Sequence, residues 1–233
     1  MTTSARPDST ETTAGSTDVG GGTGVHARWL VKDGYDVDLI DPVPRHVERA
    51  SAVCTAMEGD ARSLPAADGT YDVVQLLGPL YHLPDPADRH TALAEACRVV
   101  RPGGLVAAAA INRYASLFEH AALAHLHTER MQASITEILR TGTYDGKRGF
   151  TIAYFHRAEE LAVELKDAGL KGVEVFGIEG PAWSLLKAQQ HALGTMPSED
   201  SVASALAAAR LAESYPELHA SNSHLLAVGR ASS

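Results

Sequence analysis

Short aliphatic runs alternate with amphipathic helical segments along most of this chain, and this alternation constrains the fold more than any other feature. Residues 37–41, 72–77 and 105–110 are aliphatic and bounded by turn residues, as buried strands are. Residues 173–176 and 224–228 have the same character. Alternating strands and helices predict an α/β fold with a mostly parallel sheet.

The segments between these strands have helical spacing. A helix is expected to begin after Pro44, with four apolar residues on one face: Val47, Ala50, Cys54 and Met57. A second helix is expected to have Asp85 as its N-cap and Pro86 at its first position. Residues 114–140 are mostly helical in pattern, and a further helix is predicted over residues 159–168.

The charge balance narrows the classes of partner. Twenty-nine acidic and 20 basic side chains give a formal net charge of −9 at pH 7, which disfavours binding to a nucleic-acid backbone. No apolar run approaches the roughly 18–20 residues that cross a bilayer. Two cysteines, Cys54 and Cys97, cannot by themselves form a disulfide framework or a four-ligand zinc site. We therefore expect a cytoplasmic protein without a nucleic-acid, membrane or metal partner.

The first residues have a different composition. Residues 1–17 are rich in Thr and Ser and almost free of apolar side chains, so we expect a disordered tail. Residues 14–17 have poor strand propensity although they precede a glycine-rich turn, where a strand is needed. The expected result is a degraded first strand.

The glycine-rich turn begins at Asp18 and has glycines at alternate positions, Gly20, Gly22 and Gly24. Such a turn between a strand and a helix lets a ligand approach the backbone. The dinucleotide fingerprint would place its third glycine at Val25, and a Gly-Lys-Ser/Thr phosphate loop is also missing. Taken alone, the loop is a weak signal of a ligand site, and a plain structural turn is the less favoured alternative.

Three further features accompany this loop. Asp41 ends the second predicted strand, where a carboxylate can accept ribose hydroxyls. Asp60 follows a third short strand, where it can meet an adenine amino group. Gly78 and Pro79 follow the strand over residues 72–77, at the expected switch point of the sheet. Each aspartate is also a common turn or capping residue, but their joint order and spacing favour a nucleoside site.

In these motifs the chain resembles class I S-adenosylmethionine (SAM)-dependent methyltransferases of the bacterial small-molecule type. The resemblance covers about residues 18–233, the expected methyltransferase domain, and rests on five motifs: DVGGGTG (18–24), LID (39–41), GDARSLP (59–65), YDVVQLLGPLYHL (71–83) and the RPGG turn (101–104). It implies a Rossmann-like, seven-stranded, mostly parallel sheet flanked by helices. It also implies an antiparallel excursion of the last two strands and a helical cap insertion at about residues 112–155, after the fifth strand.

The resemblance also implies a set of SAM-binding residues: Asp18, Gly20, Gly22, Gly24, Asp41, Asp60, Ala61 and Leu77. The glycines would approach the methionine and ribose portions, and Asp41 would bind the ribose. Asp60 and Ala61 would face the adenine. The carbonyl of Leu77 would lie near the methionine amine, with Asp18 below the methionine.

Methyl transfer to an oxygen atom requires a base, and a histidine of near-neutral pKa is suited to this step. The candidate catalytic residues are His82 and its neighbour Tyr81, just after the switch point, although His82 is equally suited to capping a helix. Two triplets flank the helical insertion and either line an acceptor pocket or pack loops: Asn112, Arg113 and Tyr114, and Tyr154, Phe155 and His156. The histidines at 120, 125 and 127, with Glu119 and Glu129, do not form a convincing ligand set on one helix face.

Three functions remain open from the sequence. The favoured one is methyl transfer from SAM to a small-molecule acceptor by in-line displacement, because motifs typical of nucleic-acid methylation are missing. The second is a non-catalytic relative of the fold whose degraded first strand and missing N-terminal lid weaken cofactor binding. The third is a nicotinamide-dependent oxidoreductase, which the glycine spacing disfavours.

Overall fold

The computed structural model describes residues 14–147 and 150–232, and within them nine strands form one sheet. The strands are β1 (Gly15–Val19), β2 (Asp36–Asp41), β3 (Thr55–Glu58), β4 (Tyr71–Leu76), β5 (Val100–Asn112), β6 (Thr143–Asp145), β7 (Ile152–His156), β8 (Lys171–Gly177) and β9 (His224–Arg230). The helices are α1 (Val25–Lys32), α2 (Pro44–Ala50), α3 (Pro79–His82), α4 (Pro86–Val99), α5 (Ala115–Ala122), α6 (Glu129–Thr141), α7 (Ala158–Asp167), α8 (Trp183–Leu193) and α9 (Glu199–Ala212), with 3₁₀ turns at His125–His127 and Pro216–Ser221. The chain therefore has the predicted α/β architecture.

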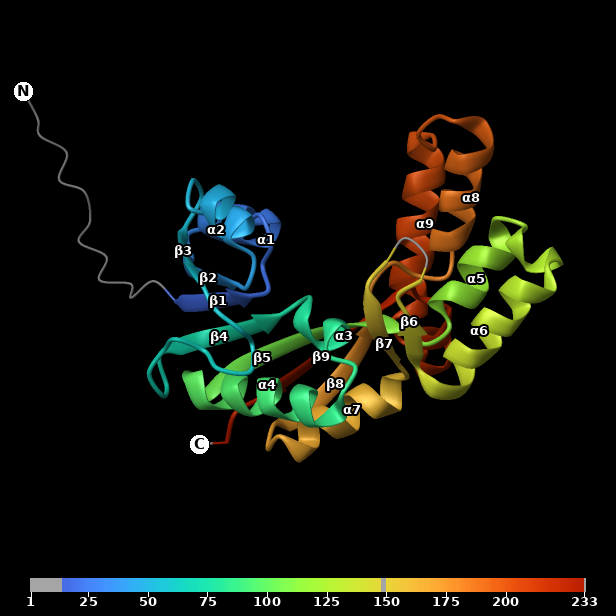
Figure 1. Cartoon of the computed structure of the whole chain (residues 1–233). Coiled ribbons are helices and arrows are strands. Elements are labelled where there is room, and N and C mark those ends of the chain that lie inside the picture. The colour runs from blue at the N-terminus through green and yellow to red at the C-terminus, as the bar shows by residue number, and fades with distance from the viewer. Residues whose placement is uncertain (1–13, 148–149, 233) are drawn as a thin grey trace, which may run out of the picture.

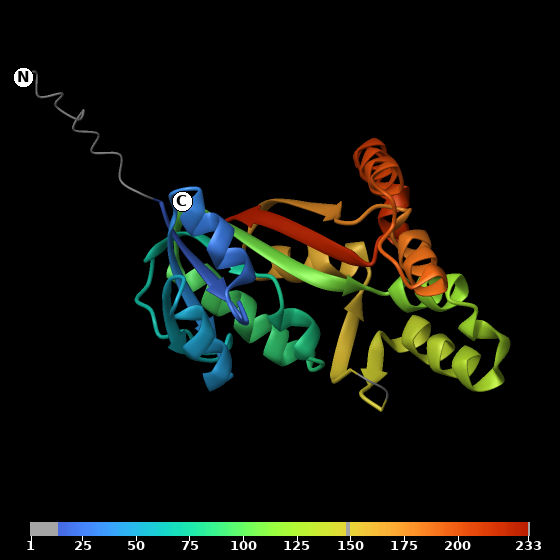
Figure 2. The same cartoon turned by 90° about the horizontal axis from the view of Figure 1, so that it is seen from above.

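Seven of these strands form the expected doubly wound sheet, in the order β3-β2-β1-β4-β5-β9-β8. Neighbours from β3 to β5 are parallel, whereas β9 runs antiparallel to both β5 and β8. Figure 2 shows β5 and β9 side by side along the middle of the molecule. The predicted antiparallel excursion of the last two strands is confirmed. The strand count is higher than seven because the hairpin β6–β7 joins the sheet.

The first strand is formed, and the expectation of a disordered tail over residues 1–17 is wrong at its C-terminal end. Residues 15–17 belong to β1, which pairs along both edges with β2 and β4. Thr17 and Asp18 are fully buried. A central strand gains two ladders and burial on both faces, which outweigh weak intrinsic propensity. Residues 1–13 lie outside the described part of the chain.

Helices cover the two faces of the sheet. Figure 1 shows α1 and α2 on one side and α4 and α7 on the other. On the first side, Ala27 and Leu30 of α1 pack with Leu39 of β2 and Ala50 of α2. The larger core lies on the second side, where buried residues of α4 and α7 meet β4, β5 and β9. Among the described residues, no helix is both long and apolar enough to traverse a lipid bilayer.

The helix predicted after Pro44 is shorter than expected. It ends at Ala50, so Cys54 lies in the following turn and Met57 lies in β3. The apolar spacing continues past the end of the helix because Cys54 still packs with Ala50 in the core around α1 and α2, whereas Met57 packs against the larger core. Around Asp85 the prediction is confirmed, since its carboxylate accepts a hydrogen bond of 2.9 Å from the Ala87 amide at the start of α4.

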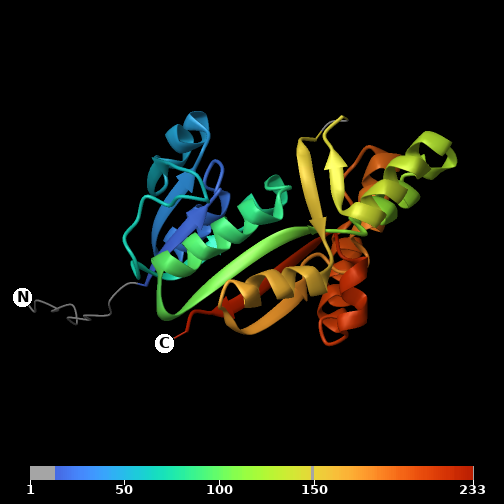
Figure 3. The ribbon, with the colours of Figure 1, turned by 60° about the horizontal axis from the view of Figure 1, so that its bottom comes forward.

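Additional elements gather beyond the end of β5. Residues 112–155 contain α5 and α6, as predicted, but also β6 and most of β7, which the sequence analysis missed. Figure 3 shows the β6–β7 hairpin standing beside the far end of β5, where Ile111 and Asn112 pair with β7. In sequence, the helices α8 and α9 follow β8 and precede β9, and α8 packs against α5. The RPGG segment lies inside β5 as an irregularity, with Gly103 at φ +74°.

Candidate functional site

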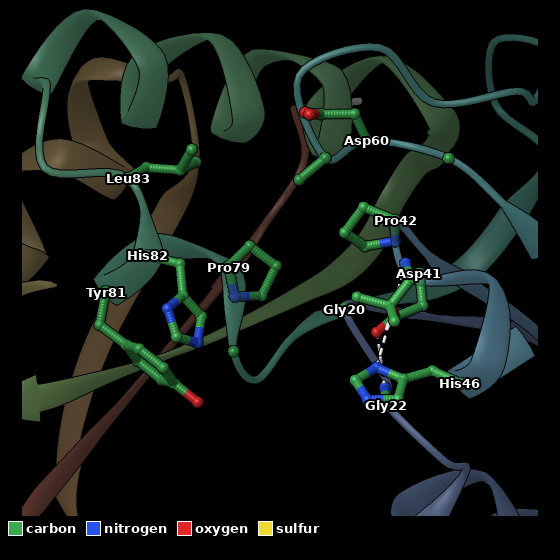
Figure 4. A pocket seen from close by; sticks show the side chains of 14 residues that line it. Gly20, Gly22, Asp41, Pro42, His46, Asp60, Pro79, Tyr81, His82 and Leu83 are labelled. Atoms are coloured by element: carbon green, nitrogen blue, oxygen red, sulfur yellow. Dashed lines mark hydrogen bonds and ion pairs between the residues drawn. The ribbon is translucent and has the colours of Figure 1, made fainter. Parts of the chain in front are cut away.

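A cavity of about 380 Å³ lies where the carboxyl ends of the central parallel strands meet, the usual place for ligands in such sheets. Its walls come from segments after four strands: Gly20 and Gly22 after β1, residues 41–43 and His46 after β2, residues 59–61 after β3, and residues 78–79 and 81–83 after β4. Figure 4 shows Tyr81 and His82 on one side of this cavity and Asp41 and His46 on the other. The structure thus brings together seven of the predicted site residues: Gly20, Gly22, Asp41, Asp60, Ala61, Tyr81 and His82.

The glycine loop turns tightly under this cavity. Gly20 and Gly22 have φ values of +68° and +58°, in the left-handed region that favours glycine. A Cβ at Gly20 would lie 2.9 Å from Pro79 Cγ, whereas at Gly22 it would meet open space. Gly21, which the sequence analysis passed over, lies so close to Asp18 that a Cβ would be 2.6 Å from its Cγ. The loop thus exposes its backbone to the cavity at Gly22.

Asp18 lies beneath the loop and does not line the cavity. Its side chain is fully buried, and within the described residues neither carboxylate oxygen makes a hydrogen bond of good geometry. Burial raises the pKa of Asp18 to about 6, and the charge of His26 and the backbone amide of Ala27 offset this only in part. Ionisation of this buried carboxyl therefore costs free energy in the folded protein.

Asp41 connects the loop to the second strand. Its Oδ2 accepts a hydrogen bond of 2.9 Å from the Gly22 amide, and its Oδ1 accepts one of 2.9 Å from the Val43 amide. His46 Nδ1 lies 3.0 Å from the same Oδ1. Asp41 is only 4% exposed, yet it borders the cavity.

Asp60 is held by an arginine that the sequence analysis did not single out. Arg62 donates to Asp60 Oδ1 from Nε at 2.9 Å and to Oδ2 from Nη2 at 2.7 Å. These hydrogen bonds lower the pKa of Asp60. Arg62 also pairs with Asp88 in the first turn of α4, at 3.0 Å. Asp60 is therefore a fixed carboxylate at the cavity edge.

Tyr81 and His82 belong to the short helix α3, on the opposite wall. Burial lowers the pKa of His82 and raises the pKa of Tyr81, so the imidazole is neutral and the phenol protonated at neutral pH. The His82 ring lies 4.6 Å from the Tyr81 ring and 5.8 Å from that of Phe150. Arg89, 3% exposed, donates to the carbonyl of Leu83 at 3.0 Å and so anchors the end of α3.

Two predicted cofactor-binding residues besides Asp18 stand outside the cavity lining. Gly24 precedes α1 at φ +82°, and a Cβ there would contact Ala50. Leu77 lies between β4 and Gly78 without reaching the lining. The lining residues that sequence reasoning missed are neighbours in sequence of those that it found: Pro42, Val43, His46, Gly59 and Leu83. Pro42, Val43 and Gly59 follow directly after a strand, whereas His46 lies in α2 and Leu83 follows α3.

The later acceptor candidates form a buried polar cluster. Arg113 donates to the Tyr154 hydroxyl at 3.1 Å, and the guanidinium of Arg89 lies 3.9 Å from the centre of the Tyr154 ring. Glu164 pairs with Arg89 at 2.8 Å and lies 3.3 Å from His156 Nε2. Burial lowers the pKa of His156. These contacts stabilise the junction of β7, α4 and α7 beside the cavity.

The remaining candidates have structural contacts. Asn112 donates to the His219 carbonyl at 2.7 Å and accepts from the Tyr114 amide at 3.2 Å. Phe155 belongs to an apolar cluster with α6. In the described residues, no group of three or more His, Cys, Asp or Glu side chains is placed to hold a metal ion.

Comparisons with known proteins agree with this geometry. A family model described as a methyltransferase domain matches residues 17–108. The chain is 31% identical over 170 residues to a ubiquinone biosynthesis O-methyltransferase of Pseudomonas paraeruginosa, covering 69% of this chain and 66% of the relative. It is 30% identical over 169 residues to the protein of the same name from Stutzerimonas stutzeri, again covering 69% and 66%. The chain thus spans just under two thirds of the length of these relatives.

Solved structures share the fold. A SAM-dependent methyltransferase from Methanosarcina mazei superposes with a TM-score of 0.60 at 17% identity, covering 94% of this chain and 93% of that one. Phosphoethanolamine N-methyltransferase 2 of Haemonchus contortus, solved in complex with SAM, has a TM-score of 0.58 at 15% identity and covers 95% of this chain and 49% of its own. The motifs, the sheet order, the cavity and the curated relatives together lead to one conclusion: the chain belongs to the class I SAM-dependent methyltransferase family.

Proposed function

We propose that this chain transfers a methyl group from SAM to a hydroxyl group of a small-molecule acceptor. One observation carries the proposal: a single cavity brings the backbone of Gly22, the carboxylates of Asp41 and Asp60, and the imidazole of His82 together. The first three suit a nucleoside, and the last lies across the cavity from Asp41 (Figure 4).

The residues present fit SAM as the bound cofactor. Gly22 leaves open the space that a Cβ would fill, so a ligand can approach the loop backbone there. Asp41 would hold the ribose hydroxyls, and Asp60 with Ala61 would face the adenine. Gly20 shapes the same loop and Gly24 begins α1 behind it. The methionine portion would extend along Gly20 toward Leu77, above the buried Asp18.

When bound, SAM supplies an electrophilic methyl group on a sulfonium. The chain must then orient the acceptor, keep water away and remove one proton. Pro79 and Leu83 provide apolar walls for this purpose. His82 accepts the hydroxyl proton on its neutral imidazole, whose lowered pKa keeps it unprotonated at neutral pH. Tyr81, whose raised pKa keeps its hydroxyl protonated, orients the acceptor by donating a hydrogen bond.

A hydroxyl acceptor is favoured by two observations. The cavity is lined by a neutral base, His82, which a hydroxyl acceptor needs and an amine that is already nucleophilic does not. The curated relatives are named O-methyltransferases. The alternative of a non-catalytic relative depended on a degraded first strand and a missing N-terminal lid. The first premise is wrong, because β1 is formed and paired on both edges, and the second falls on residues 1–13, which lie outside the described part of the chain.

Calorimetric titration tests the cofactor assignment. We expect S-adenosylhomocysteine, the demethylated cofactor, to bind while NADH does not. Transfer of labelled methyl from SAM to a panel of phenols, matched with anilines of the same ring pattern, then tests the acceptor class. Binding without transfer to any member of a broad hydroxyl panel would favour a non-catalytic protein, and binding of NADH alone would refute the assignment.

A further inference from the structure

The carboxylate of Asp41 is already engaged by groups of its own chain. Three donors from the described part of the chain reach it: the Gly22 amide on Oδ2, and the Val43 amide and His46 Nδ1 on Oδ1, at 2.9, 2.9 and 3.0 Å. An ionised carboxylate only accepts hydrogen bonds, so the imidazole is the donor in the third contact. Figure 4 shows this cluster as the dashed contacts beside His46.

The number of acceptor positions sets a limit. A carboxylate offers about four lone-pair sites, so three internal donors leave about one. A ribose with neighbouring 2′ and 3′ hydroxyls needs two sites on one carboxylate when both hydroxyls donate. One of the three internal donors must therefore leave before Asp41 can accept both hydroxyls.

Only one of these donors is free to move. The amides of Gly22 and Val43 are part of the loop and of the turn into α2, so their departure would require a backbone rearrangement. His46 is a side chain on the first turns of α2, is 42% exposed and borders the cavity. Rotation of its side chain about χ1 releases Oδ1 without disturbing the backbone.

We propose that His46 occupies, in the cofactor-free protein, the position on Asp41 that a ribose hydroxyl takes, and that nucleoside binding exchanges the imidazole for the diol. His46 is then a determinant of cofactor affinity that acts through competition. This inference rests on the proposed function, because it takes the ligand of the cavity to be a nucleoside with a free ribose diol.

The size of the effect follows from the exposure of the pair. The imidazole is 42% exposed and makes a single hydrogen bond to Asp41, a contact that contributes about 0.5–1 kcal/mol, which corresponds to roughly a two- to fivefold change in affinity. Removing the competitor by His46→Ala should therefore tighten binding of S-adenosylhomocysteine about two- to fivefold. A residue that contacted the ligand directly would give the opposite sign.

A pair of ligands isolates the diol. We would titrate wild type and His46→Ala with methylthioadenosine and with the counterpart that lacks both ribose hydroxyls. The substitution should tighten binding of the first ligand and leave the second unchanged. Arg45→Ala is the matched control, since Arg45 is an exposed neighbour on α2 outside the cavity lining, and it should alter neither affinity.

The outcomes are distinguishable. If wild type binds S-adenosylhomocysteine and His46→Ala binds it equally or more weakly, the inference is overturned and the proposed function stands. If wild type binds no adenosyl ligand, the proposed function fails and takes this inference with it. A tightening that is equal for both methylthioadenosine ligands also contradicts exchange at the diol.

A measurement on the wild-type chain covers the case in which the variant does not fold. The ¹⁵N resonance of His46 Nδ1 reports whether this nitrogen donates to a carboxylate. On saturation with S-adenosylhomocysteine, the chemical shift of this resonance should move to the value of a solvated imidazole. A resonance that keeps its carboxylate-bonded value at saturation overturns the inference.

Discussion

Replacing Asp18 by asparagine tests whether the carboxyl beneath the glycine loop stores an electrostatic cost. Its pKa rises from an ordinary 3.8 to about 6 because the side chain is buried. Each pKa unit corresponds to about 1.4 kcal/mol, so the difference amounts to roughly 3 kcal/mol between the protonated and fully ionised limits. The folded chain binds this proton more tightly than the unfolded chain does.

The direction of the pH dependence follows from linkage. The contribution of Asp18 to stability is fully present below the unfolded pKa of 3.8 and is lost as the pH rises through the folded value of about 6. Between about pH 4.5 and pH 7.5 this carboxyl should remove roughly 2 kcal/mol from the free energy of unfolding. Asparagine has nearly the same shape and cannot ionise, so Asp18→Asn should lack this loss.

Urea unfolding without added cofactor measures both proteins across this range. The amide can cost about 1–3 kcal/mol if its own hydrogen bonds are unmet, but that cost does not change with pH. The test is therefore whether the difference in free energy of unfolding between wild type and Asp18→Asn changes with pH. Asp33→Asn removes an exposed carboxylate as a control. Parallel stability curves for wild type and Asp18→Asn from about pH 4.5 to 7.5 would refute the reasoning.

Three further predictions concern the cavity. Asp41→Ala should weaken SAM binding by about 1.5–3 kcal/mol, the scale of a hydrogen bond to a charged group, and unchanged calorimetric affinity in a folded variant would contradict its ribose role. His82→Ala should lower kcat about 10²–10⁴-fold with a hydroxyl acceptor while SAM affinity stays constant. In the wild type, burial lowers the pKa of His82, so kcat should fall only when the pH drops below the ordinary histidine range. Loss of SAM binding in this variant would mark His82 as structural. Gly21→Ala should lower the free energy of unfolding in urea by about 1–3 kcal/mol, since its Cβ would lie 2.6 Å from Asp18 Cγ. The control Gly15→Ala should lower it less, because a Cβ there would lie 3.9 Å from its nearest neighbour. Equal losses of stability in the two variants would argue against a steric origin.

Much of the sheet could be predicted from local pattern. The aliphatic runs that became β2, β4, β5, β8 and β9 are short and bounded by turn residues, as buried strands are, whereas helices are longer. A parallel sheet places the carboxyl ends of its strands along one edge, so residues directly after strands meet whatever their separation in sequence. For this reason Gly20, Asp41, Asp60 and His82 could be assigned to one site before any contact was known.

The elements that the sequence analysis missed depend on partners distant in sequence. Residues 15–17 form β1 because β2 and β4 pair with both edges, and no local propensity records that gain. The end of α2 at Ala50 and the β6–β7 hairpin are likewise decided by neighbouring strands.

The same division holds inside the site. Residue type and position after a strand identified the carboxylates Asp41 and Asp60, because an acid at a strand end is visible in the sequence. Their partners, His46 and Arg62, became known only from the tertiary structure. A side-chain hydrogen bond requires two atoms about 3 Å apart, and the order of residue types does not give such distances. Residue order alone therefore assigned Asp41, Asp60 and His82 to one cavity, whereas the packing of α2 and of the segment after β3 set the hydrogen-bond partners of the two carboxylates.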